Sequence, residues 1–378
     1  MSTIKVNSIK NTSTDDGGIA IDNSGHVQID GQQLPTTGAL SNRRLNDNGA
    51  MQVAQRGTSF TSNGYTLDRW RFSTNSGAFT VTQSSTAPAG FTNSLKVDCT
   101  TTGTPTGQDE GFVETKIEAQ NLQHLQFGTS GAQPVTLSFH VKSNKTGSYG
   151  LWVYQEDAAS QYATTYTISS ADTWEHKTIT ISGNTATAIN NDNGMGLDFR
   201  FYLVAGSDYA GTPAEAWTTT LTSNRTTSLN LADSTSNEWF ITGVQLEVGE
   251  KATPFEHRSF GDELLRCQRY YYRVSASSTG FNLRTSGYAT SSTNARVNIP
   301  YGVDMRTAPT ALEQSGTAGD YSVRGLSNVN CNAVPAHFSA DTHGALVDLS
   351  VASGLTAGQG AFLRTVGSNA FFAWSAEL

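Results

Sequence analysis

Aromatic and polar side chains alternate with apolar ones along three segments of the chain, residues 135–142, 151–155 and 197–203. Together these side chains have the chemistry needed to hold a sugar. Sugars present flat apolar faces and many hydroxyl groups, so proteins bind them with aromatic rings and a few convergent hydrogen-bonding groups. If the three segments are strands of one sheet, alternate residues share its outward face. The candidate binding residues are then Trp152, Tyr154, Asp198, Arg200, Tyr202 and His140.

The alternation in the segment LWVYQ is compatible with two orientations. Trp152 and Tyr154 share one face of the predicted strand, and Leu151 and Val153 share the other. In the first orientation the two aromatic rings face outward and form a platform for a glycan. In the second they face the core, which is where a single tryptophan more often lies, and the aliphatic pair faces solvent or another subunit.

Carboxylates that are close in sequence raise the possibility of a glycosidase. Asp109, Glu110 and Glu114 are near neighbours, and such enzymes need two carboxyl groups roughly 5–9.5 Å apart across a cleft. These three flank a Gly/Thr-rich loop, so we expect them to be solvated. The sequence also lacks a GxSxG motif, a phosphate loop and a dinucleotide fingerprint. We therefore predict a protein without catalytic activity or a cofactor.

The seven histidines are scattered and give only a weak indication of metal binding. No pair has the spacing of a zinc-binding helix. His337 and His343 lie around a loop that contains Asp341, but loop histidines are more often plain surface residues. The oxygen-rich run at 190–194 lacks the spacing of a calcium-binding loop and reads better as an Asn/Gly turn. We predict no metal site.

The elements that would position these residues are mostly short strands. Val135, Leu137, Phe139 and Val141 alternate with polar residues, as is typical of an antiparallel strand with one face on a core. Similar segments separated by Asn/Gly turns continue over about 200 residues. This pattern predicts an all-β fold with a jelly-roll sandwich over residues 49–257.

The remaining segments predict three further parts. Residues 1–48 have few apolar side chains and one possible hairpin, so we expect an extended β arm for attachment and trimerisation, or alternatively a partly disordered arm. Ser259 and Asp262 can cap a short helix, and we assign residues 258–271 to a connecting helix. Residues 272–378 return to strands and predict a smaller β-sandwich at the tip.

Composition narrows the possible partners. The formal net charge is −8 and charged residues make up 15% of the chain; there is no basic stripe, which argues against nucleic acid. No run of apolar residues is long enough for a membrane span, and no apolar segment follows the N-terminus as in a secretory signal. Three widely spaced cysteines fit folding in a reducing cytoplasm. Cytoplasmic synthesis together with a wet, Thr/Ser-rich surface is typical of a virion component.

Several motifs resemble bacteriophage tail-fibre and tail proteins that carry a carbohydrate-binding-module-like jelly roll. The motifs are NGAMQVAQRG with YTLDRW, VTLSFHVKS with TGSYGLWVYQ, DTWEHKTITISG, and above all VQLEVGEKATPFEHRSFGDELLRCQRYYYR. MRTAPT resembles the matching segment of their C-terminal domain. STIKVNSIKN with GIAIDNSGHVQIDG is similar to openings of marine and cyanobacterial phage structural proteins. The resemblance is strong over residues 49–310 and weakens over the last 60.

The resemblance implies a non-enzymatic tail fibre that recognises a host-surface polysaccharide as a homotrimer. Its N-terminal arm would join another tail or adaptor protein of the virion, and assembly would take place in the bacterial cytoplasm. The resemblance marks the scaffold and names no sugar pocket. The alternative is a structural or decoration protein of the head, collar or tail that has no receptor role.

Overall fold

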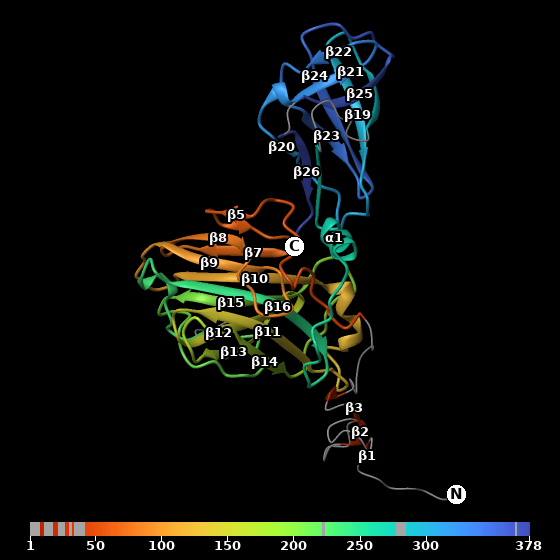
Figure 1. Ribbon diagram of the computed structural model, residues 1–378. Coiled ribbons are helices and arrows are strands. Elements are labelled where there is room, and N and C mark those ends of the chain that lie inside the picture. Colours follow the sequence, from red (N-terminus) through yellow and green to blue (C-terminus); the bar gives the residue numbers. More distant parts are fainter. Residues whose placement is uncertain are drawn as a thin grey trace, which may run out of the picture. The chain divides into compact units, whose positions relative to one another are not determined.

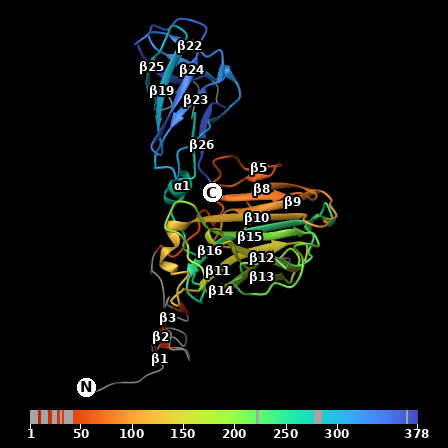
Figure 2. The same cartoon turned by 180° about the vertical axis from the view of Figure 1, so that it is seen from behind.

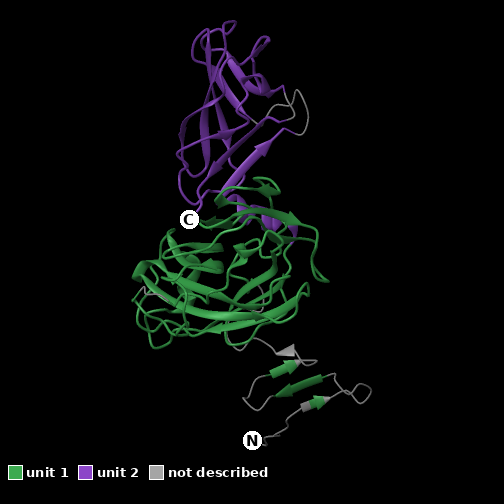
Figure 3. Cartoon of the chain, turned by 90° about the vertical axis from the view of Figure 1, so that its left-hand side faces the viewer, with its two compact units in different colours: residues 1–258 green, residues 259–378 purple. Residues whose placement is uncertain are grey.

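Strands dominate the part of the chain that the structure describes. This computed structural model describes residues 8–10, 18–21, 27–29, 32–33, 42–220, 224–276, 285–366 and 369–378. The fold is all-β, as the sequence predicts. The chain divides into two compact units, residues 1–258 and residues 259–378 (Figure 3). The short helix falls within the second unit.

The larger unit is built on two six-stranded antiparallel sheets (Figures 1 and 2). Sheet 1 has, in spatial order, the strands β13 (Ser160–Ile168), β12 (Gly147–Gln155), β15 (Met195–Ala205), β10 (Glu110–Glu118), β7 (Trp70–Thr74) and β6 (Gly64–Tyr65). Sheet 2 has the strands β14 (Glu175–Ile181), β11 (Val135–Ser143), β16 (Glu238–Val248), β9 (Ser94–Thr101), β8 (Ala78–Ser84) and β5 (Ser59–Phe60). From β10 to β16 the chain passes repeatedly from one sheet to the other, in the manner of a jelly roll.

The apolar face of each sheet contributes to one core. Phe139 of sheet 2 meets Phe201 of sheet 1 edge to face, with ring centroids 5.2 Å apart. Trp70 and Trp239 are fully buried beside them. Because the core takes alternate residues of each strand, the residues between them point away from it. Short 3₁₀ helices lie in the connections: η1 (Ala119–Leu125), η2 (Glu156–Ala158) and η3 (Leu231–Asp233).

The N-terminal segment contains a small antiparallel sheet of four strands. They are β1 (Ser8–Lys10), β2 (Gly18–Ile21), β3 (Val27–Ile29) and β4 (Gln32–Gln33). β2 and β3 pair as the alternation predicts, while the turn expected at residues 23–25 lies outside the described residues. Ile9 lies opposite Ile19, and Ile21 lies opposite Val27. All four of these side chains are exposed.

The smaller unit begins with the predicted helix, α1 (Phe260–Gln268). The Ser259 hydroxyl caps it by accepting a hydrogen bond from the amide of Asp262. No helix formed by the described residues is long and apolar enough to span a membrane.

Two antiparallel sheets follow, and their apolar faces share one core around Phe372 and Trp374. The first sheet has the order β17 (Tyr271–Ser275), β26 (Phe371–Ser375) and β20 (Glu313–Gln314). The second has the order β22 (Asn328–Asn330), β21 (Tyr321–Arg324), β25 (Gly360–Thr365), β18 (Ser286–Ala289), β19 (Asn294–Pro300), β24 (Gly344–Ser350) and β23 (Ala336–Ala340). The 3₁₀ helix η4 (Ala318–Asp320) precedes β21.

Candidate ligand-binding faces of the larger unit

Five of the six predicted binding residues gather on the outer face of sheet 1. Trp152 on β12 lies opposite Arg200 on β15, and Tyr154 lies opposite Asp198. Tyr202 follows two residues after Arg200 on the same face. Leu151 and Val153 are in the core, so the first of the two orientations considered for this strand is the observed one.

A buried charge cluster occupies the middle of this face. Arg200 lies opposite Glu114 on β10, which in turn lies opposite Arg71 on β7. The Glu114 carboxylate is 2.9 Å from Arg200 Nε and 2.7 Å from Arg71 Nη1. Although burial opposes its ionisation, Arg200, Lys116 and Arg71 hold the pKa of Glu114 below its ordinary value. The expectation that Glu114 is solvated is wrong, because its side chain is fully buried among these cations.

Asp198 is the second buried carboxyl group of the cluster. Its Oδ2 lies 2.8 Å from Arg200 Nε, and its Oδ1 is buried without a hydrogen-bond partner. Burial and the neighbouring Glu114 carboxylate raise the pKa of Asp198 to about 7. Two carboxylates that share one guanidinium cannot both ionise at low cost.

The aromatic rings on this face are covered by other side chains of the protein. Trp152 stacks on Tyr154 with ring centroids 5.0 Å apart, and the guanidinium groups of Arg200 and Arg225 lie 4.8 and 5.0 Å from its ring centroid. Its Nε1 donates a hydrogen bond to Gln161. Trp152 is only 3% exposed. It therefore cannot serve as the exposed platform that the sequence suggested.

Tyr202 is equally inaccessible, since it is 2% exposed and its hydroxyl donates to Glu110. Tyr154 is half-buried, and the side chains of Arg71 and Arg200 are 32% and 20% exposed. Of the five predicted residues on sheet 1, only Tyr154 and Arg200 therefore leave part of the side chain open to a ligand.

His140 lies on the other sheet, so the single patch of six residues predicted from the sequence does not form. It lies on β11 directly opposite His176 on β14, with ring centroids 4.7 Å apart. Outward residues of β11 and outward residues of β15 face opposite sides of the sandwich. The strand pattern shows which residues face outward but not which sheet a strand joins.

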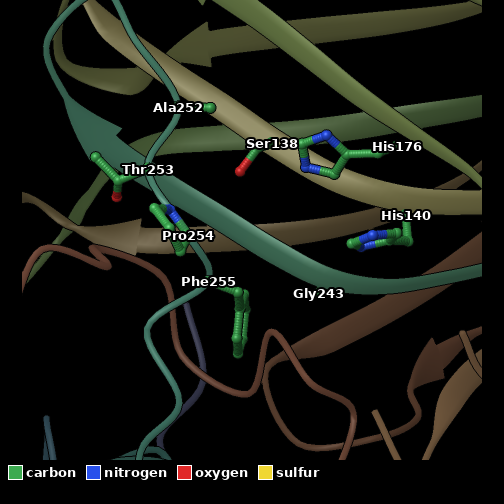
Figure 4. Close-up of a pocket in the computed structure, with 8 residues that line it drawn as sticks. All are labelled: Ser138, His140, His176, Gly243, Ala252, Thr253, Pro254 and Phe255. Carbon is green, nitrogen blue, oxygen red and sulfur yellow. The ribbon is translucent and has the colours of Figure 1, made fainter. Parts of the chain in front are cut away.

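His140 and His176 line a pocket of about 330 Å³ on the outer face of sheet 2 (Figure 4). Its volume is at the lower end of the roughly 300–1,000 Å³ typical of ligand pockets. The other residues that line it are Ser138, Gly243, Ala252, Thr253, Pro254 and Phe255.

One wall of the pocket is the segment that follows β16 and folds back over the sheet. The Glu247 carboxylate accepts hydrogen bonds from the Thr253 amide (2.8 Å) and hydroxyl (2.6 Å). Gln245 accepts from the Glu256 amide at 2.7 Å. Because these partners are outward residues of β16 itself, they fix the returning segment, and with it the Phe255 ring, above the sheet.

The floor of the pocket contains a β-bulge at Gly243. The register between β11 and β16 shifts between Ser138 and His140, and Gly243 has φ +62°, a conformation that favours glycine. A Cβ at this position would lie 2.6 Å from the Phe91 ring and 3.0 Å from His140 Nδ1. The bulge therefore lets both rings pack against the backbone.

Phe255 is the aromatic ring beside the two imidazoles that lines the pocket, and Phe91, outside the lining, packs against it. The ring of Phe91 lies 5.3 Å from that of His140, 5.0 Å from that of Phe255 and 5.3 Å from that of His257, measured between centroids. The pocket thus combines an aromatic surface with the hydroxyl of Ser138 and two imidazoles.

Both imidazoles of the pocket are neutral at neutral pH. Burial, assisted by the neighbouring His176, lowers the pKa of His140 to about 4, and burial also lowers the pKa of His176. A neutral imidazole offers one donor and one acceptor. His140 Nδ1 is buried without a hydrogen-bond partner, so its other nitrogen is the one available to a ligand.

The described residues contain no group of three or more His, Cys, Asp or Glu side chains arranged to hold a metal ion. His343 contacts Asp304 and Asp341 only at 3.5 and 3.8 Å.

Three residues that line the pocket, His176, Ser138 and Phe255, are not among those predicted from the sequence. Ser138 was visible as an alternate residue of the His140 strand, two positions away. The pairing of His140 with His176 depends on strand register, which the pattern alone does not give. Phe255 belongs to the motif VQLEVGEKATPFEH, which the sequence marks as a scaffold feature and not as part of a site.

Comparisons with known proteins give distant structural likenesses only. No family model matches the chain, and no curated protein matches it. A bacteriophage CBA120 tailspike protein 4 enzymatically active domain is 12% identical (TM-score 0.31), and the match covers 54% of this chain but only 21% of that one. A structure titled "CBM4 structure and function" is 12% identical (TM-score 0.31; 53% and 98% covered). A family 11 carbohydrate-binding module of a Clostridium thermocellum cellulase is 11% identical (TM-score 0.27; 57% and 99% covered).

Proposed function

We propose that this chain is a non-enzymatic, glycan-binding phage tail fibre that recognises a polysaccharide of the host cell surface. The observation that carries the proposal is the pocket on sheet 2. Its lining includes two neutral imidazoles, the Ser138 hydroxyl and the Phe255 ring. The Phe91 ring packs against His140 and Phe255 from outside the lining.

This combination suits an uncharged sugar ring. Ring faces of a sugar are apolar and pack on aromatic side chains, and its hydroxyls both donate and accept hydrogen bonds. Neutral imidazoles and a serine hydroxyl match that dual character. The volume of about 330 Å³ admits a single sugar unit or a short segment of a chain.

A binding role without catalysis fits the chemistry of the pocket better than glycoside hydrolysis. Hydrolysis requires two carboxyl groups that flank the scissile bond. None of the residues that line the pocket carries one. Glu247, which lies behind its wall, is occupied by hydrogen bonds from Thr253.

The proposal includes a homotrimer that is attached to the virion through the N-terminal arm. The sheet of β1 to β4 presents Ile9, Ile19, Ile21 and Val27 on one face, where they are 63%, 44%, 46% and 36% exposed. So small an apolar face gives little independent stability, and it suits association with further copies or with an adaptor protein. Three copies would multiply a weak affinity per site.

The test compares binding of the labelled full chain to host and non-host cells, together with its position on the particle. We expect selective binding to host cells. His140→Ala should weaken this binding, whereas His124→Ala, at an exposed histidine outside the pocket, should retain it. Equal binding to both cell types would contradict the proposal. Antibody labelling of the capsid surface in place of the tail would favour the structural or decoration alternative.

A further inference from the structure

The smaller unit has a pocket of its own on the three-stranded sheet. Its volume is about 330 Å³ and it is lined by Arg273, Ser275, Ser315, Asn369, Ala370 and Phe371. Ser275 lies opposite Phe371 in the sheet. The alternate residues Val274 and Phe372 pack into the core, so Arg273, Ser275 and Phe371 lie on the outward face.

The Arg273 side chain is held in place without its charge being matched. Its guanidinium carbon lies 3.8 Å from the centroid of the Phe371 ring, and its Nε donates a hydrogen bond to the Ser275 hydroxyl at 3.0 Å. Among the residues that the structure describes, Arg273 has no ion-pair partner. Its two terminal nitrogens therefore remain available in a fixed orientation.

A second arginine of the same unit has the carboxylate partner that the guanidinium group of Arg273 lacks. The guanidinium of Arg296 also lies on an aromatic ring, that of Phe338, at 3.1 Å. There, however, Nε and Nη2 bind the two carboxylate oxygens of Asp348 at 2.7 and 3.0 Å. Arg296 is thus saturated in the bidentate geometry that guanidinium groups favour with carboxylates.

Glu313, on the adjoining strand β20, does not fill this role for Arg273. Its side chain accepts a hydrogen bond from the Tyr271 hydroxyl at 2.8 Å. The remaining polar groups that line the pocket, on Ser275, Ser315 and Asn369, are hydroxyls and an amide. They are suited to the hydroxyl groups of a sugar.

We propose that this pocket binds the carboxylate of an acidic sugar, a uronic acid unit, through the terminal nitrogens of Arg273. Ser275, Ser315 and Asn369 contact the sugar hydroxyls. The inference rests on the proposed glycan-binding function and adds a second site of different specificity, in which one charged group is required. A phosphate group has the same basic chemistry of recognition, so the test must separate the two.

The experiment is isothermal titration of the full chain with three probes: an oligosaccharide of hexuronic acid, its neutral hexose counterpart and inorganic phosphate. We expect the oligouronate to bind, and Arg273→Gln to weaken that binding about tenfold or more, as expected for the loss of a charge-assisted bidentate contact. The matched control is Arg296→Gln. It removes an arginine that also stacks on an aromatic ring but whose guanidinium group is already paired with Asp348. It should bind like the unmodified chain.

Each alternative result has a definite meaning. Equal weakening by both substitutions, or none by Arg273→Gln, would overturn the proposal. Inorganic phosphate that binds as tightly as the oligouronate, with the same loss in Arg273→Gln, would assign a phosphate site instead. His140→Ala should leave oligouronate binding intact, so failure of the sheet 2 pocket and failure of the Arg273 pocket are distinguishable.

Discussion

At the scale of single residues, the larger unit holds ionisable groups in unusual states on both of its outer faces. His140 is neutral because it is packed against Phe91 and the backbone of Gly243. Burial, together with the ionised Glu114 carboxylate, raises the pKa of Asp198 and so favours its protonated form. These two shifts make opposite contributions to the pH dependence of stability.

Replacing His140 should reduce the amount by which the free energy of unfolding falls at acidic pH. Its pKa is about 4 in the folded chain and 6.5 in an ordinary environment, so the unfolded chain binds the extra proton between these values. His140 therefore lowers the free energy of unfolding as the pH falls from about 6.5 to about 4. Urea unfolding at pH 7 and pH 5 should show a smaller loss in His140→Gln than in the unmodified chain. Equal losses would contradict a buried, neutral His140.

Replacing Asp198 should have the opposite effect. Its pKa of about 7 lies above the ordinary value of 3.8, so the folded chain binds the extra proton, and stability falls as the pH rises between these values. Asp198→Asn removes this loss, so its stability relative to the unmodified chain should increase from pH 4 to pH 7. Asp208→Asn, at an exposed position, is the control and should show no such trend. The same trend in both variants would argue against the shift at Asp198.

At the scale of elements, the alternation along each strand predicts its two faces correctly but not the sheet that it joins. Val135, Leu137 and Phe139 correctly predict the core face of their strand. The capping residue Ser259 likewise predicts the helix that follows it. The assignment of His140 to one patch with Trp152 fails because sheet membership depends on long-range pairing. The Gly243 bulge and the return of Phe255 over β16 are likewise tertiary features with no local signature.

Trp152 illustrates the consequence for mutagenesis. Because it packs against Tyr154, Arg200 and Arg225 and is 3% exposed, Trp152→Ala should lower the free energy of unfolding by about 3–5 kcal/mol, as for other buried tryptophans. Glycan binding should persist under conditions in which the variant remains folded. Urea unfolding and a binding titration on the same sample check this prediction. Unchanged stability with lost binding would instead identify Trp152 as a ligand platform.

At the scale of the whole molecule, the chain contains two compact β units and an N-terminal sheet whose apolar face is exposed. Each unit carries a pocket of similar volume with different chemistry, neutral and aromatic in the first and cationic in the second. Two sites of this kind would let one chain bind both uncharged and acidic units of a polysaccharide.

Assembly should depend on the apolar face of the N-terminal sheet. Light scattering of the full chain should give three times the subunit mass of 40.3 kDa. Ile19→Asp should reduce this to the mass of a monomer because it places a charge in the middle of the apolar face. Ala20→Asp, whose side chain lies on the opposite face of the same strand, should remain trimeric. A monomeric unmodified chain would remove the basis for the trimer.

The central claim is that the sheet 2 pocket binds a neutral glycan unit, and calorimetric titration tests it most directly. The ligands are oligosaccharide fragments released from the surface polysaccharide of the host, and the proteins are the unmodified chain, His140→Ala, Ser138→Ala and the His124→Ala control. We predict binding by the unmodified chain and the control, with a loss of about tenfold or more in His140→Ala and a smaller loss in Ser138→Ala, as expected when hydrogen-bonding groups are removed. Equal affinity in all four folded proteins would contradict the claim.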